Sequence, residues 1–258
     1  MSFQDHFSAV SKSYQQYRPT YPDELFYHLS HVCQEHTCAW DCATGTGQSA
    51  RALAPYFDRV IATDGSEAQV LIAQKNQNQP NAKNGPESKL EFKTATAEHS
   101  GLADHSVDLI TVSQAVHWFD LQAFATEVRR VLKPTGVLAI WCYSLLSIEN
   151  DIDALVNHFY YDVVGPYWPI ERKLVENGYQ DIQLPFKEIP VPNYAMQASW
   201  NLPQLLGYLS TWSALRLYIE EQGTNPLDTL TTQLEEVWGD HEQIRAIHWP
   251  LSLRIWQL

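Results

Sequence analysis

The stretch AWDCATGTGQ, residues 39–48, decides the fold, because a short apolar run there ends in a Gly-x-Gly turn. Gly45 and Gly47 allow the backbone to approach a ligand closely. They also expose amide donors at the start of a helix that we predict over residues 48–56, which suits a carboxylate or phosphate. Asp41 stands four positions before Gly45. The turn therefore predicts one wall of a ligand site and leaves the ligand open.

Strand-like and helix-like segments alternate on both sides of this turn. Their hydrophobic spacing predicts strands at residues 37–43, 59–64, 90–98, 107–112 and 136–143, and helices at residues 22–31, 48–56, 66–75 and 119–132. The polar residues 76–89, which contain Pro and Gly, predict a loop. This alternation predicts a parallel sheet with helices on both faces, whose ligands bind at the carboxyl ends of the strands. The strand ends that mark the candidate site are residues 41–48, 64–66, 96–99 and 113–118.

The pattern changes to helices after Tyr143. One apolar stripe of helical spacing covers residues 148–163, and further helices begin at Asn201 with Pro203 and at Asn225 with Pro226. Residues 180–192 predict a strand between them, and residues 247–258 alternate like a closing strand. The late helices are best explained as an insertion that caps the strand ends.

Composition and charge narrow the classes of partner and compartment. A chain of 258 residues that is 45% hydrophobic can bury a sizeable core. The net charge of -13, with no basic run, argues against nucleic acid, because such binding depends on clustered Lys and Arg. The longest apolar run, residues 137–148, is about half of what crosses a bilayer, and the start of the chain lacks the features of a signal peptide. We expect a cytoplasmic protein that does not enter a membrane.

Cysteine and histidine crowd one segment without the spacing of a metal motif. The residues concerned are His28, His31, Cys33, His36, Cys38 and Cys42. No pair among them has zinc-motif spacing, and with Cys142 the four cysteines show neither a CxxC pair nor a disulfide framework. We therefore expect no metal and a reducing compartment.

A nicotinamide dinucleotide is the first alternative for the glycine turn. Gly45, Gly47 and Ala50 fit the fingerprint Gly-x-Gly-x-x-Gly/Ala, and Asp64 stands near the position of a ribose-binding acid. Asp41 argues for a different ligand, because a carboxylate there would lie near the pyrophosphate of a dinucleotide but complements the amino group of an amino-acid-like ligand.

Taken in order, the motifs resemble the class I S-adenosylmethionine-dependent methyltransferases. The stretches that carry the resemblance are DCATGTGQ (41–48), ATDGSEAQV (62–70), TATAEHSGLADHSVDLITVSQAVHWFD (94–120) and LKPTGVLAIW (132–141). The similarity covers about residues 3–143 and is strongest to the branch of small-molecule enzymes related to trans-aconitate methyltransferases. The later stretch TWSALRLY (211–218) also looks like that branch.

The resemblance implies a Rossmann-like α/β fold. The sheet would be mostly parallel with an antiparallel closing strand, and a helical cap would follow the fifth strand. We expect one methyltransferase domain over residues 1–258. Residues 1–143 would form its cofactor-binding core, residues 144–245 a helical cap with a sixth strand, and residues 246–258 the closing strand.

The resemblance also implies S-adenosyl-L-methionine as the cofactor and a set of residues that would hold it. Asp41 and the glycine turn would line the methionine part, Asp64 would accept the ribose hydroxyls, and Glu98 would approach the adenine. The full set is Arg18, Asp41, Ala43, Gly45, Gly47, Asp64, Gly65, Ser66, Ala97, Glu98, Gln114 and Ala115. Many relatives carry Gly where this chain has Ala43, so a methyl group there would narrow the pocket.

The acceptor side is predicted by a second set of residues. His117 is the candidate for taking a proton from a hydroxyl or amine acceptor, whereas a carboxylate acceptor needs no base. The residues expected to face the acceptor are Trp118, Trp168, Arg172, Trp212 and Arg216. Each has a structural alternative, since tryptophans are often core and arginines are often surface cations.

The main hypothesis from sequence is therefore in-line methyl transfer to a small-molecule carboxylate, hydroxyl or amine. The alternatives are an NAD(P)-dependent oxidoreductase and a cofactor-binding protein without turnover. The sequence carries no signal for the oligomeric state.

Overall fold

The middle strand of the parallel part of the sheet is β1, the strand that leads into the glycine turn. The computed structural model describes residues 17–77 and 89–258. Two parallel strands lie on each side of β1, in the order β3-β2-β1-β4-β5. The strands of this part are β1 (Ala39–Cys42), β2 (Arg59–Asp64), β3 (Lys89–Thr94), β4 (Val107–Ser113) and β5 (Leu132–Tyr143). The predicted parallel sheet is confirmed. The predicted loop at residues 76–89 and the start of the resemblance near residue 3 lie outside the described residues, except for the ends of that loop.

The sheet closes with the antiparallel strand β8 (Arg245–Gln257), as predicted. One half of β8 pairs with β5 and with the short β6 (Lys187–Ile189). The other half pairs with β7 (Tyr194–Trp200), and Leu251 is paired on both sides, with Tyr143 and with Tyr194. The strand predicted over residues 180–192 is therefore only three residues long, and β7 was not predicted. Its sequence YAMQASW alternates as a half-buried strand does, because Tyr194, Met196, Ala198 and Trp200 pack on the core and the residues between them are exposed. The signal for this strand was therefore present in the sequence.

Helices cover both faces of the parallel strands. Neighbouring residues of β1 point to opposite faces, so Ala39 joins one hydrophobic cluster and Trp40 the other. The helices α2 (Asp23–Val32), α3 (Gln48–Leu53) and α4 (Glu67–Gln77) contribute to the first cluster, and α5 (Leu121–Val131) contributes to the second. This arrangement buries the central strands on both sides, which explains their continuous apolar runs.

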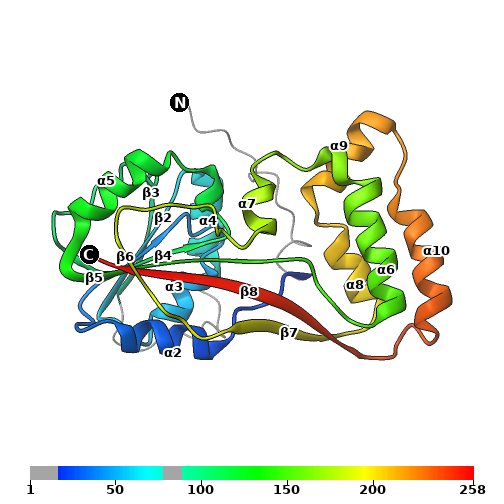
Figure 1. The fold of residues 1–258 in the computed structure, drawn as a ribbon, viewed down its shortest axis with the longest axis horizontal. Helices are drawn as coiled ribbons and strands as arrows, with labels where there is room; N and C mark the ends of the chain where they lie inside the picture. Colours follow the sequence, from blue (N-terminus) through cyan, green and yellow to red (C-terminus); the bar gives the residue numbers. More distant parts are fainter. Residues whose placement is uncertain (1–16, 78–88) are drawn as a thin grey trace.

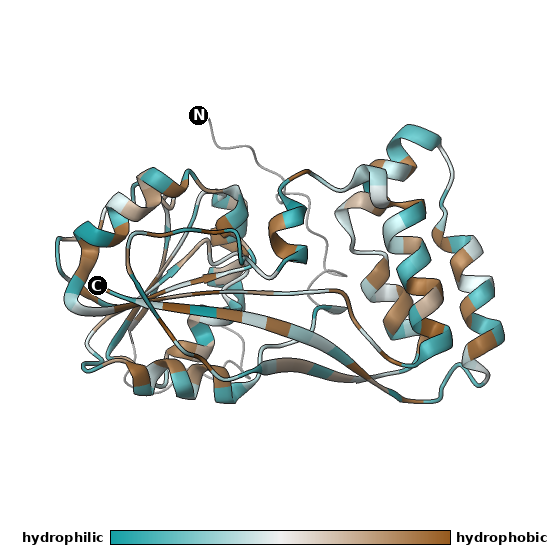
Figure 2. Ribbon diagram, in the orientation of Figure 1, coloured by the Kyte–Doolittle hydropathy of each residue, from teal (hydrophilic) through white to brown (hydrophobic). Residues whose placement is uncertain are grey.

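The remaining helices lie together beyond the sheet, at the far end of β7 and β8 (Figure 1). They are α6 (Asn150–His158), which continues into the π-helical turn η2 (Phe159–Val163), the 3-10 turn η3 (Gly165–Tyr167), α8 (Leu202–Leu209), α9 (Ser213–Gln222) and α10 (Leu227–Trp238). Figure 2 shows hydrophobic and hydrophilic residues mixed along each of them, as in amphipathic helices. A further short helix, α7 (Arg172–Glu176), returns to the sheet. The division of the chain into a cofactor-binding core and a cap stays a prediction.

Two helices replace the single one that the sequence predicts after Asn201. The chain leaves the helix at Trp212, whose backbone is extended (φ -69°, ψ 130°). The hydroxyls of Ser210 and Thr211 donate to the carbonyls of Gly207 and Tyr208. Such local side-chain bonds compete with the helical ladder. The break in the helix directs the Trp212 ring towards a buried aromatic cluster, where it contacts Tyr160.

No helix within residues 17–77 and 89–258 is both long and apolar enough to cross a membrane.

A buried carboxylate of α5 anchors the turn that follows β3. Glu127 is 6% exposed and accepts hydrogen bonds from the amide of Ser100 (2.9 Å) and from Arg130 (2.7 Å). Burial alone would raise the pKa of Glu127, but the bonds from Arg130 and Ser100 outweigh it and hold that pKa at about 2. Ionised Glu127 therefore fixes the chain next to Ala97 and Glu98.

We expect Glu127→Gln to lower the free energy of unfolding by about 2–3 kcal/mol at pH 7, because the folded carboxyl has a lower pKa than the unfolded one. This contribution is present above about pH 4.5 and fades as the pH falls towards 2. The measurement is urea unfolding at pH 7 and pH 3, with the exposed Glu236→Gln as control. If Glu127→Gln lowers the free energy of unfolding equally at both pH values, the stabilisation does not come from the lowered pKa of Glu127.

Candidate functional site

The glycine turn combines three residues in the left-handed region of backbone space. Ala43, Gly45 and Gly47 have φ values of 55°, 55° and 83°. A Cβ on Gly47 would lie 2.7 Å from the Phe92 ring, so the close packing at this position requires glycine. A Cβ on Gly45 would meet no atom within 4 Å. The turn therefore packs tightly behind Gly47 and leaves open space at Gly45.

Ala43 adopts the same left-handed conformation without being glycine. For a residue with a Cβ this conformation costs about 1–2 kcal/mol. The position that departs from many relatives is thus one where the backbone itself favours glycine.

Asp41 holds the turn from below. Its carboxylate is fully buried and accepts hydrogen bonds from the hydroxyls of Thr44 (2.5 Å) and Thr111 (2.7 Å). Burial raises the pKa of Asp41 to about 6, although both threonine hydroxyls oppose the shift. Asp41 thus joins β1, β4 and the turn through protein contacts, which favours a role in shaping the site.

Asp64 connects the glycine turn to the end of β2. Its Oδ2 accepts from the amide of Gly45 (2.8 Å) and its Oδ1 from the amide of Ser66 (2.9 Å), while the side chain is 9% exposed. The Oγ of Ser66 accepts from the amide of Gln69 at the start of α4, so Ser66 caps that helix. Gly65 lies between them and is partly buried. A carboxylate offers about four acceptor positions, so Asp64 suits further donors such as ribose hydroxyls.

The turn after β3 places Ala97 and Glu98 beside the start of α5. His99 donates its amide to the carbonyl of Thr96, and Ala97 is buried. Glu98 is half-buried and accepts from the amide of Asp120 (3.2 Å). The two predicted adenine neighbours therefore lie at a strand end of the same sheet edge.

Arg18 and Gln114 both bind Tyr143 at the end of β5. Gln114 is left-handed (φ 54°), and its side-chain amide donates to the carbonyl of Tyr143 (3.3 Å). Arg18 donates to the hydroxyl of the same tyrosine (2.5 Å). Gln48, at the start of α3, donates to the carbonyl of Pro19, which brings the Arg18 segment beside the glycine turn. Ala115, next to Gln114, is buried.

His117 lies in the short 3-10 helix η1 (Val116–Trp118) and contacts Tyr179. Its Nδ1 is 2.8 Å from the Tyr179 hydroxyl, and its ring stacks at a tilt beside Trp118. Burial, followed by the positive charge of Arg172, lowers the pKa of His117 to about 3. The imidazole is therefore neutral at ordinary pH and weakly basic.

Arg172 is the centre of an aromatic cluster formed by η2, α7 and α9. Its Nε donates to the hydroxyl of Tyr160 (2.8 Å), and its guanidinium lies over the rings of Trp168 (4.8 Å to the centroid) and Tyr160. The ring of Trp212 packs against both aromatic neighbours. Three predicted acceptor residues, Trp168, Arg172 and Trp212, are thus brought together.

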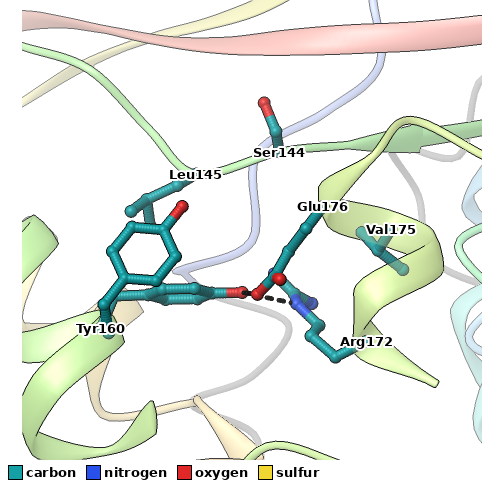
Figure 3. Close-up of a pocket in the computed structure, with 7 residues that line it drawn as sticks. Ser144, Leu145, Tyr160, Arg172, Val175 and Glu176 are labelled. Atoms are coloured by element: carbon teal, nitrogen blue, oxygen red, sulfur yellow. Dashed lines mark hydrogen bonds between the residues drawn. The ribbon is translucent and has the colours of Figure 1, made fainter. Parts of the chain in front are cut away.

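A cavity of about 140 Å³ opens beside this cluster (Figure 3). Figure 3 shows the Tyr160 hydroxyl, Glu176 and Arg172 converging at one point, where Tyr160 donates to the exposed Glu176 (2.8 Å). Among the described residues Arg172 forms no ion pair, and Glu176 reaches it only through the Tyr160 hydroxyl. A largely buried cation with aromatic neighbours and no carboxylate partner suits an anionic ligand.

Arg216 is not part of this cluster. It lies on the exposed side of α9, where it pairs weakly with Glu220 (3.9 Å), whereas Ala214 and Leu215 of the same helix are buried. Of the predicted cap cations, the structure therefore brings only Arg172 to the aromatic cluster.

Sequence reasoning missed three tyrosines of the site. Tyr143, Tyr160 and Tyr179 hold Arg18, Arg172 and His117 respectively. Only Tyr143 stood at a predicted strand end, and Tyr179 follows the turn signal Asn177-Gly178. The described residues contain no group of three or more His, Cys, Asp or Glu side chains arranged to hold a metal ion.

Comparison with known proteins gives consistent matches over most of the chain. Residues 40–140 match a protein family described as a methyltransferase domain. A protein of Dictyostelium discoideum named as a methyltransferase is 36% identical over 250 residues, which are 94% of this chain and 91% of that protein. The Saccharomyces cerevisiae protein CRG1, named as an S-adenosylmethionine-dependent methyltransferase, is 24% identical over 88% of this chain and 87% of its own.

A solved structure from Anaeromyxobacter dehalogenans, described as a type II methyltransferase, has the same fold. It matches with a TM-score of 0.83 and 36% identity, covering 93% of this chain and 97% of that one. The predicted Rossmann-like fold is thereby confirmed, and the family favours methyl transfer over the nicotinamide chemistry that the same glycines permit. The chain belongs to the class I S-adenosylmethionine-dependent methyltransferases.

Proposed function

We propose that this methyltransferase acts on a small-molecule acceptor bound between the carboxyl ends of the strands and the helical cap. The observation that carries the cofactor part of this proposal is the hydrogen bond from the Gly45 amide to Asp64. This bond places a nearly buried carboxylate next to the open space at Gly45. A Cβ on Gly45 would project into that space, which is the room that a cofactor backbone needs.

The residues around this space fit S-adenosylmethionine. Asp64 would accept the ribose hydroxyls, Ala97 and Glu98 would flank the adenine, and Arg18 would pair with the methionine carboxylate. Gln114, Ala115 and Ala43 would line the methionine end, and Asp41 would support the turn. When bound, the cofactor supplies a methyl group on a positively charged sulfur. The chain then has to align the acceptor, exclude water and hold both ligands in line.

Arg172 supports an acidic acceptor, as the resemblance to the trans-aconitate branch does. Its guanidinium is held by Tyr160 and Trp168 and has no carboxylate partner among the described residues. An anionic group of the acceptor would complete its hydrogen bonding and neutralise its charge. Tyr160 and Tyr161, which line the cavity beside Arg172, would pack against the rest of the acceptor, and Trp168 and Trp212 would support the Tyr160 ring.

Calorimetric titration with S-adenosylhomocysteine tests the cofactor assignment. We expect the wild-type protein to bind, and Asp64→Ala to weaken binding by about 10- to 100-fold, because a charge-assisted hydrogen bond contributes about 1.5–3 kcal/mol. The exposed Asp58→Ala serves as matched control and should bind normally. Binding of NADH in place of S-adenosylhomocysteine, followed by fluorescence, would refute the assignment.

Ala43→Gly tests the strained position in the turn. We expect the free energy of unfolding to rise by about 0.5–1 kcal/mol, because the relief of left-handed strain exceeds the extra unfolded-state entropy of glycine. Affinity for S-adenosylhomocysteine should be at least that of the wild type. As control, Ala68→Gly in the right-handed helix α4 should lose about 1 kcal/mol. A comparable loss of unfolding free energy in both variants would show that the backbone at Ala43 is not strained.

Arg172→Gln tests the acceptor side. A panel of acids, phenols and amines would be screened with cofactor carrying a labelled methyl group. For an acidic acceptor found this way, we expect Arg172→Gln to raise KM by about 10- to 100-fold with little change in S-adenosylhomocysteine binding. The exposed Arg216→Gln should leave KM unchanged. An effect of Arg216→Gln alone would overturn the assignment, and no transfer to any panel member would favour a protein without turnover.

A further inference from the structure

The contact between His117 and Tyr179 joins the end of the sheet to the segment after α7. The Nδ1 of His117 lies 2.8 Å from the Tyr179 hydroxyl, and Tyr179 is 1% exposed. Neither residue has another side-chain hydrogen bond among the described residues. The proton of this single bond therefore belongs either to the tyrosine or to the imidazole.

The available hydrogen-bond partners decide whether Tyr179 or His117 carries this proton. If Nδ1 carried the proton, the Tyr179 hydroxyl would accept it and its own proton would have no acceptor in a buried place. Leaving a buried donor unsatisfied costs its full desolvation free energy. If the tyrosine donates to Nδ1, the buried hydroxyl and Nδ1 are both satisfied, and the imidazole proton sits on Nε2, where it is available to a ligand.

Charged forms of either group do not change this choice. Burial raises the pKa of Tyr179 well above its usual value, so the hydroxyl keeps its proton. Burial and the charge of Arg172 lower the pKa of His117 to about 3, so the imidazole stays neutral. Arg172 is the charged group acting on both residues, and the electrostatic environment of Tyr179 also includes Cys142 and Tyr21.

We propose that Tyr179 is a positioning residue that fixes His117 with its proton on Nε2, so that His117 donates a hydrogen bond to the methyl acceptor and does not remove the acceptor's proton. This inference rests on the proposed function, since it assigns a role within the same site. The nitrogen lone pair that a base would need is occupied by the tyrosine.

The backbone at Tyr179 has an unfavourable conformation that is held in place by β8. Gly178 and Tyr179 are both left-handed, with φ of 66° and 63°, which is an outlier for an aromatic residue. A Cβ on Gly178 would lie 2.5 Å from the hydroxyl oxygen of Ser252 in β8. Arg254 of the same strand donates to the carbonyl of Tyr179 (2.6 Å). An unfavourable conformation secured by two contacts to β8 is the kind of strain that is retained at functional sites.

The assignment narrows the chemistry of the acceptor. With His117 as donor and Arg172 as cation, the site favours an acceptor whose reacting atom has a lone pair and no proton to lose, such as an ionised oxygen. That lone pair becomes the new bond to the methyl group, the electrons of the broken carbon–sulfur bond remain on sulfur, and no proton passes to His117.

Nitrogen NMR of the histidine ring tests the tautomer without any turnover. In protein labelled with ¹⁵N-histidine, we expect His117 to show the Nε2–H form from pH 5 to pH 9 with no titration. Tyr179→Phe should remove this preference and shift the ring resonances. The signal would be assigned by its loss in His117→Gln. An Nδ1–H form, or a titration between pH 5 and pH 9, would overturn the inference even if the protein binds its cofactor.

Kinetics of three substitutions separate a donor from a base. The amide of His117→Gln places N–H near the Nε2 position, whereas His117→Asn places it near Nδ1. We expect His117→Gln to keep kcat within about tenfold of the wild type, and His117→Asn and His117→Ala to lose about 100-fold. The exposed His158→Gln on α6 is the control and should keep full activity.

A base would be lost equally in all three variants, so equal losses in glutamine, asparagine and alanine would overturn the donor role. Thermal unfolding of each variant checks that it folds. The NMR measurement needs no acceptor. If His117→Gln does not fold, the ring signals of the wild type are assigned through their correlation with the backbone, so the tautomer is decided in either case.

Discussion

The carboxylate of Asp64 accepts hydrogen bonds from two turns at once, and the rest of the site depends on this contact. One bond fixes the amide of Gly45 and the other fixes the amide of Ser66, so the ends of β1 and β2 keep a constant separation. A buried carboxylate needs such donors, because burial without them is costly. Asp41 does the same beneath the turn, through Thr44 and Thr111 of two different segments. Two acids that the sequence marked as ligand residues therefore also build the shape that a ligand would meet.

The parallel core could be predicted because its signals are local. The strands at residues 59–64 and 107–112 are apolar runs with clear ends, and their structural bounds agree within a residue. Gly47 packs closely against the Phe92 ring, whereas its predicted close approach to a ligand stays a prediction. Ala43 departs from the glycine of many relatives, and its positive φ explains why glycine is favoured there and why alanine carries a cost.

The cap could not be predicted at the same level, because its structure depends on distant partners. The alternating sequence of β7 indicates a strand, but it does not indicate that half of β8 is its partner. The break before Trp212 follows from bonds of Ser210 and Thr211 to the preceding turn and from burial of the indole ring. Arg172 and Arg216 looked alike in sequence, yet only the fold brings one of them onto Trp168. Helical spacing places a residue on a face, but it does not say which face meets the site.

The strand β8 is shared by the sheet and the cap, and this has a mechanical consequence. Leu251 pairs with Tyr143 on one side and Tyr194 on the other, at the point where the strand leaves the parallel sheet. Next to it, Pro250 has no amide to donate, while its carbonyl accepts from Ser144. The hydrogen-bond ladder of β8 therefore lacks one donor next to the residue where the strand passes from β5 to β7. The cap helices are therefore connected to the sheet by a continuous strand. A movement that opens the acceptor side has to bend β8.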